Sequence, residues 1–438
     1  MKVSRRQFLG TSAAAVIVAG TMAKGKVFGA NDRIAVCCMG INGRGTSHIN
    51  DIIDDPVGEV VALCDVDSKV LEGKAGIVKN KQKSEPKLFR DIRDALADKS
   101  IDAITVATPN HWHSLATIWA CKAGKDVYVE KPLSHSLWEG RQLVAAAEKY
   151  GRIVQHGTQS RADTTLIRDI KMMHDGFIGD IVHSRGYVYK NGNRGSIGRG
   201  KPSAPPANLD WTLWQGPSPE HDYLKKEKGD GGLQVHYNWH WFWLYGNGEI
   251  GNQGVHEMDI ACWGHNVLKR GLPVKAMSQG GRYGLDDDGE TPNTQATSFT
   301  YADGTMMTFE VRNLGSYPEC GDEDCSNSFF GTKGYYQRGV GFFDYKKKPI
   351  QVDAPKPEGM SMFAHFFKAM RSRKQEDCPM TPLDGSLSCA HIHIGNIAYR
   401  LGRSVVFDPK AEKFVSDEEA NGMVKRVYRE GFEPEQLV

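Results

Sequence analysis

The chain has 438 residues and an ordinary globular composition, with 40% hydrophobic and 25% charged residues and a formal net charge of +2. Acidic and basic residues are nearly balanced, 53 against 55, so the sequence offers neither a basic stripe for nucleic acid nor an acidic tail. A chain of this length exceeds what one hydrophobic core usually supports, so we expect two domains, with small molecules or further copies of the chain as partners.

The first thirty residues have the pattern of a twin-arginine export signal. Arg5-Arg6 precede Phe8-Leu9, and a run of small apolar residues follows over 11–23. The run is too short and too weakly hydrophobic for a transmembrane span, and small residues at 21–23 and 28–30 give two candidate cleavage sites. We predict a signal segment over residues 1–30 and export to the periplasm by the twin-arginine route. A disordered basic tail and an uncleaved membrane anchor are the alternatives.

The nine cysteines do not indicate a disulfide framework. Cys320 and Cys325 alone are spaced for a local bridge or metal contact, and two free thiols are the competing interpretation. No second pair has zinc-like spacing, so we predict no metal site. Most of the others lie in apolar segments, where cysteine behaves as a small buried hydrophobic residue: Cys37, Cys38, Cys64, Cys121 and Cys262.

From residue 33 the chain alternates short β-branched runs with helix-length amphipathic segments. Such runs predict buried parallel strands, and their alternation with helices predicts a doubly wound Rossmann sheet. Ser136 and Glu139 form a capping box for a helix that ends near Tyr150, with Gly151 as its stop signal. The predicted strands cover residues 34–39, 60–64, 103–107, 127–129 and 153–155.

The first strand runs into a glycine-rich loop that fits the pattern G-x-G-x-x-G. The loop comprises Gly40, Asn42, Gly43, Arg44 and Gly45, with Asn42 in the second glycine position. Glycines there allow a sharp turn and a close approach to a pyrophosphate, which the N–H groups at a helix start can bind. Asparagine tolerates the left-handed conformation, so we expect Asn42 to be acceptable there.

Asp65 closes the second strand twenty positions after Gly45. A carboxylate there can accept both ribose hydroxyls and repel the additional phosphate of NADP. We therefore predict NAD rather than NADP, with a solvated acid at a strand end as the alternative. An exported protein that loads NAD before export should hold the nucleotide tightly.

Two further motifs follow the ends of predicted strands, where open sheets place their ligands. The first contains Thr108, Pro109, Asn110 and His113, and the second is Glu130-Lys131-Pro132. We expect these residues beside the nucleotide. A lysine held under a nicotinamide can bind a substrate hydroxyl, and burial would make its pKa easy to tune. A surface lysine is the alternative.

These motifs resemble the Gfo/Idh/MocA oxidoreductases, the glucose-fructose oxidoreductase and inositol dehydrogenase family. Gly157-Thr158-Gln159 and the G-x-H-x-x-D pattern over 254–259 extend the resemblance over most of the chain. It implies a nucleotide domain over 31–158, with Gln159 at the nucleotide, and an α+β domain over 159–438 built on an open, mainly antiparallel sheet. It further implies a homo-oligomer, a dimer or tetramer, and a cis Lys131–Pro132 bond.

The resemblance also implies a catalytic set of a lysine, a histidine and an aspartate four residues before that histidine. Lys131 and His256 hold the first two positions, and Asn252 stands where the aspartate is usual. Asn252 could orient the His256 ring but cannot supply negative charge, so His256 should be a weaker base than in relatives. A structural histidine is the alternative for His256.

The second domain contains a concentration of aromatic residues over 236–245. Aromatic faces pack on sugar rings and polar neighbours bind hydroxyls, so we expect Asn238 and His240, together with Lys131 and His256, at the substrate. Core packing is the competing interpretation for about half of these rings. A loop over 191–215, rich in glycine and proline, could wrap the pocket or a neighbouring subunit.

The sequence from about residue 275 to residue 402 predicts a sheet followed by helices. Strand-like alternation covers 275–283, 295–301, 305–313 and 335–345, and the carboxyl-terminal helices lie within about 360–402. The first helix has an apolar stripe of Phe363, Phe366, Phe367 and Met370. His391 and His393 lie in the second helix and, two residues apart, face different sides, so we expect packing roles for both.

The sequence therefore predicts an exported NAD-dependent oxidoreductase acting on a hydroxyl of a sugar or glycoside. Two alternatives remain. One is an enzyme that cleaves a glycosidic bond through transient oxidation, although the Tyr-Pro-Thr-His-Gly pattern of one such group is absent around the histidine. The other is a non-catalytic protein that binds nucleotide or sugar.

Overall fold

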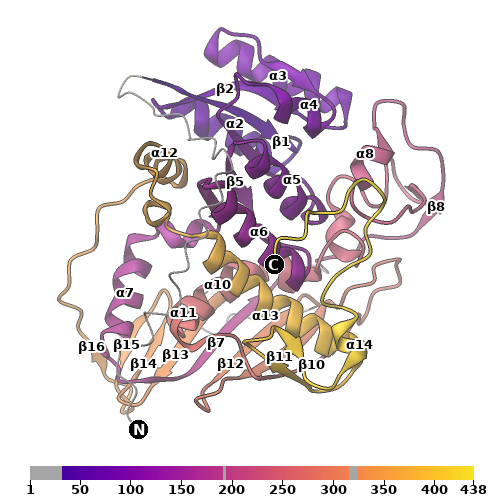
Figure 1. Ribbon diagram of the computed structural model, residues 1–438. Coiled ribbons are helices and arrows are strands. Elements are labelled where there is room, and N and C mark those ends of the chain that lie inside the picture. The colour runs from indigo at the N-terminus through magenta and orange to yellow at the C-terminus, as the bar shows by residue number, and fades with distance from the viewer. Residues whose placement is uncertain (1–31, 191–193, 315–323) are drawn as a thin grey trace.

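The computed structural model describes residues 32–190, 194–314 and 324–438 (Figure 1). The predicted signal segment and Cys320 lie outside the described residues. An amino-terminal α/β domain and a larger α+β domain meet along one side, and the carboxyl terminus returns to the boundary between them.

The first domain is built on a six-stranded sheet in the order β3-β2-β1-β4-β5-β6, with every neighbouring pair parallel. The five predicted strands are all present, and β3 is an edge strand that the sequence pattern did not reveal. The strands are β1 (Ile34–Met39), β2 (Gly58–Cys64), β3 (Lys87–Phe89), β4 (Ala103–Val106), β5 (Asp126–Glu130) and β6 (Val154–Gly157).

Both faces of this sheet are covered, which explains why its strands are apolar throughout. In β1, Cys37 and Met39 belong to one core while Val36 and Cys38 belong to the other. This arrangement confirms the doubly wound prediction. The helices of this domain are α2 (Arg44–Asp54), α3 (Ser68–Gln82), α4 (Ile92–Ala97), α5 (Asn110–Lys122) and α6 (Leu137–Tyr150).

The predicted capping box of α6 is half correct. Ser136 Oγ accepts the backbone N–H of Glu139 at 3.3 Å, and Gly151 ends the helix in the left-handed region. The carboxylate of Glu139 instead accepts the backbone N–H of His135 and binds Arg426 from the carboxyl-terminal tail. Glu139 therefore binds the carboxyl-terminal tail to the first turn of α6 instead of capping the helix.

The second domain contains a ten-stranded sheet in the order β16-β15-β14-β13-β7-β12-β11-β10-β17-β18. Its pairs are antiparallel except β12 with β7, which confirms a mainly antiparallel sheet. The strands are β7 (Ile181–Tyr189), β10 (Lys275–Gly281), β11 (Thr294–Thr300), β12 (Met306–Arg312), β13 (Cys325–Gly331), β14 (Tyr335–Gln337), β15 (Gly341–Phe343), β16 (Pro349–Ile350), β17 (Val405–Asp408) and β18 (Lys413–Phe414). A separate hairpin pairs β8 (Gly200–Pro202) with β9 (Leu224–Lys226).

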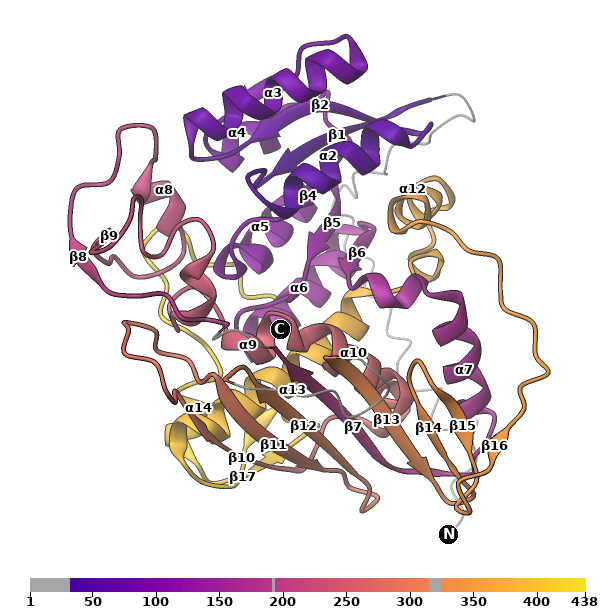
Figure 2. The same cartoon turned by 180° about the vertical axis from the view of Figure 1, so that it is seen from behind.

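One strand prediction in this sheet is wrong. Residues 335–345 form two strands, β14 and β15, because Gly339 has a φ of +80° and turns the chain back between them. Helices α10 (Gly254–Gly264) and α13 (Pro382–Leu401) lie along one face of the sheet, as Figure 2 shows from behind. Further helical segments of this domain are η1 (Gln159–Ala162), α7 (Thr164–His174), α8 (Trp211–Gln215), η2 (Asn238–Trp241), α9 (Gly248–Gly251), α11 (Val267–Arg270), η3 (Gln375–Asp377) and α14 (Glu418–Asn421).

The carboxyl-terminal part of the chain contributes to both domains. The predicted apolar stripe lies on α12 (Met362–Ser372) and packs on the sheet of the first domain, where Phe363 stacks on Tyr128 with ring centroids 4.5 Å apart. Further along, Phe432 packs edge-on against Trp112 of α5. A boundary at residue 158 thus separates the sequence motifs but not the two hydrophobic cores.

A buried ion pair joins the start of the second domain to α10. The Arg161 guanidinium donates to both oxygens of Asp259 at 2.8 and 2.7 Å, and Ser388 of α13 donates to the same carboxylate at 2.9 Å. Asp259, the last residue of the G-x-H-x-x-D pattern, therefore fixes α10 in place.

His391 hydrogen-bonds with Tyr301, and His393 with Ser134, which is consistent with packing roles for both histidines. Within the described ranges, no helix is long and apolar enough to cross a membrane.

Candidate active site

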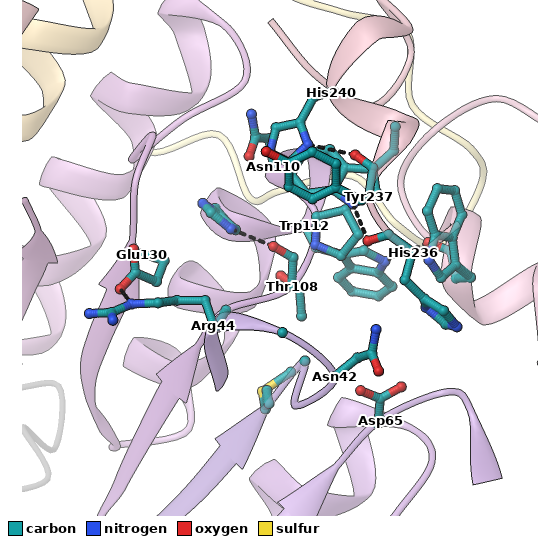
Figure 3. Close-up of a pocket in the computed structure, with 18 of the residues that line it drawn as sticks. Asn42, Arg44, Asp65, Thr108, Asn110, Trp112, Glu130, His236, Tyr237 and His240 are labelled. Atoms are coloured by element: carbon teal, nitrogen blue, oxygen red, sulfur yellow. Dashed lines mark hydrogen bonds and ion pairs between the residues drawn. The ribbon is translucent and has the colours of Figure 1, made fainter. Parts of the chain in front are cut away.

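A pocket of about 460 Å³ lies at the carboxyl ends of β1, β2, β4 and β5, facing the segment from Arg194 to His256 (Figure 3). Asn42 and Asp65 lie at one end, and Asn110, Tyr237 and His240 lie at the other. Of the residues that the sequence placed at the site, Gly45 and Asn238 do not line the pocket. Gly45 serves the backbone instead, because a Cβ there would lie 2.3 Å from the Gly40 carbonyl oxygen.

The glycine loop leaves the start of α2 open toward the pocket. Gly40 has a φ of +71°, and a Cβ there would lie 2.5 Å from the Thr108 nitrogen. A Cβ on Gly43, the residue before α2, would have nothing within 4 Å, and no side chain caps this helix end. The helix N–H groups are thus available to phosphate oxygens. Asn42 is outside the left-handed region, so the reason given above for tolerating asparagine does not apply.

Asp65 occupies the position expected for a ribose ligand. Its carboxylate accepts backbone N–H groups from Ile41 at 2.9 Å and Asp67 at 3.0 Å, which fixes both oxygens at the pocket wall. Burial raises the pKa of Asp65, and the two backbone N–H donors oppose that shift.

Glu130 holds the glycine loop and the exit of β6 together. Its Oε1 lies 2.8 Å from Arg44 Nε, 3.0 Å from His48 Nε2 and 3.3 Å from Gln159 Nε2. Burial would raise the pKa of this carboxyl, but His48 and Arg44 hold it well below its usual range. Glu130 is therefore an anion that positions Arg44 and Gln159.

Two buried polar atoms of the motif over residues 108–113 lack a protein partner. Thr108 Oγ1 and Asn110 Nδ2 are buried in the pocket wall without a hydrogen bond in the described structure. Buried polar groups are nearly always satisfied, so these atoms indicate a polar ligand. Together with the open helix start and Asp65, they fit a dinucleotide. His113 supports the motif from behind, its ring nitrogens each 2.7 Å from the carbonyl oxygens of Pro132 and Thr108.

Lys131 reaches across the pocket to the second domain. Its Nζ donates to the Asn252 backbone oxygen at 2.8 Å and to Asn252 Oδ1 at 3.2 Å. The following Lys131–Pro132 bond is cis, as the resemblance implied. Burial lowers the pKa of Lys131, and the Glu130 carboxylate opposes that shift. A lysine with a depressed pKa, held at a pocket, is suited to proton transfer or to polarising a hydroxyl.

Asn252 contacts the lysine rather than the histidine. It lies in the turn between α9 and α10, where its side-chain N–H groups face Tyr237 Oη at 3.4 Å and Glu249 Oε2 at 3.5 Å. Among the described residues it makes no hydrogen bond to His256, so the expected orienting role is not seen. The helix break directs the Asn252 carbonyl to Lys131.

His256 lines the pocket beside Lys131. Burial and then the Lys131 charge lower the pKa of its ring to about 3, so the imidazole is neutral at neutral pH. Burial and Lys131, rather than the asparagine at 252, cause this low pKa, so the expectation of a weaker base than in relatives stays a prediction.

Several lining residues were not anticipated. Arg194, Tyr237, Trp239, Gln253 and His236 all face the pocket, whereas Asn238 does not. Tyr237 and Trp239 lie within the aromatic run from which Asn238 and His240 were chosen, and of these two His240 lines the pocket while Asn238 does not. Arg194 stands in a polar stretch without periodicity, and no sequence signal singles it out.

The segment over residues 203–216, here called the bridging segment, passes along the nucleotide end of the pocket. Asn208 O accepts the Ser68 N–H at 2.9 Å, and the Asp210 N–H donates to Val66 O at 3.0 Å. The Asp67 carboxylate accepts Asn208 Nδ2 at 2.8 Å and lies 3.3 Å from His236 Nε2. The second domain is thus fastened to the residues just after Asp65.

Comparison with known proteins gives two family models that together span the site. Residues 33–158 match a model described as an oxidoreductase family with an NAD-binding Rossmann fold, and residues 171–434 match its carboxyl-terminal α/β domain. The nucleotide predicted from Asp65 and the glycine loop is thereby identified as NAD.

Two curated relatives match over less than half of this chain. A glycosyl hydrolase family 109 protein of Shewanella pealeana is 26% identical over 216 residues, covering 43% of this chain and 47% of that relative. An inositol 2-dehydrogenase of Salmonella typhimurium is 30% identical over 153 residues, covering 34% and 44%. The matches thus span less than half of these relatives. The WlbA dehydrogenase of Bordetella pertussis, solved with NADH and UDP-GlcNAcA, has a TM-score of 0.60 at 20% identity over 86% of this chain and 99% of that one.

The bridging segment generates a prediction about nucleotide release. Replacing both Asn208 and His236 by alanine removes the two side chains that bind Asp67, so bound nucleotide should dissociate roughly tenfold faster, as expected for two partly exposed hydrogen bonds to a carboxylate. The release rate can be followed by NADH fluorescence after dilution. Lys201→Ala in the nearby hairpin is the control, and equal rates for all three proteins would show that the contacts of Asn208 and His236 with Asp67 do not hold the nucleotide.

Proposed function

The chain belongs to the Gfo/Idh/MocA oxidoreductase family, and from that premise we propose that it is an NAD-dependent oxidoreductase acting on a hydroxyl of a sugar or glycoside. The observation that carries the proposal is the position of Lys131. It stands beside His256 between the nucleotide end of the pocket and an aromatic, hydrogen-bonding end. NAD, when bound, supplies a hydride acceptor for the carbon that bears the hydroxyl.

Lys131 has the donors needed to hold that hydroxyl oxygen. Two of its contacts go to Asn252 oxygens, which fix the ammonium group, and an ammonium group has three N–H donors. The remaining donor can bind the substrate oxygen and stabilise negative charge there.

His256 would receive the hydroxyl proton. A ring with a pKa of about 3 is a weak base toward an ordinary alcohol. Transfer of hydride from the carbon makes the hydroxyl proton progressively more acidic, so a neutral imidazole can accept that proton in the same step while Lys131 holds the oxygen. The burial that weakens this base also keeps it unprotonated and ready.

The pocket supports tight retention of NAD in preference to NADP. Asp65 places a carboxylate where the ribose hydroxyls would lie, and the bridging segment binds the residues after it. A retained nucleotide must be reoxidised by a second substrate, which gives ping-pong turnover.

The test of Lys131 separates chemistry from nucleotide binding. Lys131→Met keeps the length of the side chain but removes its N–H donors, so sugar-dependent reduction of bound NAD should fall by at least about 100-fold while nucleotide content stays constant. Absorbance of the reduced nicotinamide across a sugar panel measures the first, and mass spectrometry of released nucleotide measures the second. Lys333→Met is the control. An unimpaired rate in Lys131→Met would exclude the catalytic role.

Transient oxidation that cleaves a glycosidic bond is the second candidate. The observation that favours it is Tyr237, whose hydroxyl lies 3.3 Å from Arg194 Nη2 and 3.4 Å from Asn252 Nδ2. Both neighbours are donors, so the Tyr237 proton is left to face the pocket and could be given to a leaving group. Likeness to a glycosyl hydrolase family 109 protein adds support. Aryl glycosides distinguish the two: aglycone release without added acceptor supports cleavage, and net NADH formation without release supports the dehydrogenase.

We also propose export through the twin-arginine route, on the basis of Arg5, Arg6 and the apolar run that follows. Replacing both arginines by lysine keeps the charge but removes the recognised pair, so the protein should remain in the cytoplasm. Cell fractionation in a bacterium with this route measures the distribution. A Lys2→Arg, Lys24→Arg variant is the charge control, and unchanged periplasmic protein in the arginine-pair variant would contradict the proposal.

A further inference from the structure

The half of the pocket contributed by the second domain has an unusual charge pattern. Its described lining residues include one arginine and no aspartate or glutamate. They are Arg194, Leu213, Trp214, His236, Tyr237, Trp239, His240, Asn252, Gln253 and His256. Carboxylates that line the pocket, such as Asp65 and Glu130, come from the nucleotide-binding domain and are engaged there.

Arg194 is anchored on one edge and open on another. Its Nε lies 3.0 Å from Glu249 Oε1, and its Nη2 donates to Tyr237 Oη at 3.3 Å. The Glu249 side chain has no exposed surface, whereas that of Arg194 is 30% exposed. No bond to Nη1 is recorded among the described residues, so Nη1 and the second hydrogen of Nη2 remain available. Two adjacent N–H groups of a guanidinium match the two oxygens of a carboxylate.

A continuous set of contacts connects Arg194 to the reacting centre. Tyr237 Oη lies next to Arg194 Nη2, Asn252 Nδ2 lies 3.4 Å from the same hydroxyl, and Asn252 Oδ1 accepts from Lys131 Nζ at 3.2 Å. A ligand whose hydroxyl meets Lys131 can therefore place another substituent at Arg194. Asn252 is neutral, so nothing at that position cancels the lysine charge.

His240 and His256 do not change the balance. Burial lowers the pKa of His240 well below its usual value and that of His256 to about 3, so both rings are neutral at neutral pH. Behind the wall, Glu249 offsets Arg194 and the partly exposed Arg338 lies 3.8 Å from the buried Glu257. Arg194 is thus the permanent cation that this half of the pocket presents to a ligand, and Lys131 faces it from the residue just after β5 in the first domain.

We propose that the substrate carries an anionic group, best matched by a sugar carboxylate, which pairs with Arg194 while its reacting hydroxyl meets Lys131. The inference rests on the proposed function and names the substrate class for the same site. A neutral sugar would leave the free edge of Arg194 without an acceptor, whereas an anion would gain charge-assisted hydrogen bonds.

Matched sugars test the charge preference directly. Glucuronate against glucose and galacturonate against galactose compare a carboxylate with a neutral group on one ring configuration, and glucose 6-phosphate tests phosphate as the anion. We expect kcat/KM for reduction of bound NAD to be about 10- to 100-fold higher for an anionic member than for its neutral partner, the range for one or two charge-assisted bonds. Preference for either anion supports the proposal and identifies the group. Equal values, or preference for the neutral sugars, would overturn it.

Variants link the preference to these residues. Arg194→Gln with Glu249→Gln removes both charges together, which avoids leaving a buried carboxylate unpaired, and the anionic-to-neutral ratio should fall to about one. Arg270→Gln with Asp303→Asn removes a comparable pair away from the pocket and should keep the wild-type ratio. Asn252→Asp adds a negative charge beside Lys131 with almost no change of shape and should lower the ratio. Thermal melting confirms that each variant is folded.

A binding measurement separates failure of this inference from failure of the proposed function. Trp214 and Trp239 line the pocket, so tryptophan fluorescence can report ligand affinity without turnover. If no sugar transfers hydride but glucuronate binds at least tenfold more tightly than glucose, and the Arg194 variant loses this difference, the anion site stands and the dehydrogenase proposal fails. If sugars react without any charge preference, the dehydrogenase stands and the anion site is refuted.

Discussion

The contact between Lys131 Nζ and the Asn252 backbone oxygen, 2.8 Å long, is the interaction on which the site depends. It joins the end of β5 in one domain to a break between two helices in the other. A carbonyl oxygen fixed by the helix break gives the ammonium group one position, and a buried ammonium without such a partner would be costly. The geometry of the pocket is therefore set by how the two domains meet, and several other bonds serve that meeting.

Those other bonds fall at both ends of the pocket. Asp259 with Arg161 fixes α10 from below, and Asp67 with Asn208 and His236 fastens the second domain at the nucleotide end. Phe432 and α12 return to pack on the first domain, so neither hydrophobic core is complete without distant parts of the chain. Because each core contains residues from distant parts of the chain, the two domains are held together more firmly than two domains that meet only at an interface.

Features set by short stretches of sequence could be predicted, whereas features set by contacts between distant residues could not. The strands of the nucleotide domain, the glycine loop and the placement of Lys131 follow from short-range patterns. The sequence pattern did not predict strand β13, because its middle residues, Ser326 to Ser328, are polar and yet buried between β7 and β14. The partner of Asn252 could not be derived from spacing, since the break between α9 and α10 turns it toward Lys131, 121 positions away. Arg194 was missed for the same reason, because its role depends on Glu249 and Tyr237.

These contacts also decide which charged groups remain at the reacting centre. Burial keeps the His256 ring neutral, and the Glu130 carboxylate is paired with Arg44 and His48. Lys131 is therefore the main fixed charge at the reacting centre. With asparagine at position 252, that charge is held by dipoles rather than neutralised by an anion. A lysine held in this way stabilises negative charge on a bound oxygen more strongly than one already paired with a carboxylate. For the proposed reaction, a neutral residue at 252 thus leaves the Lys131 charge to act both on the bound oxygen and on His256, whose pKa is lowered by burial and by that charge.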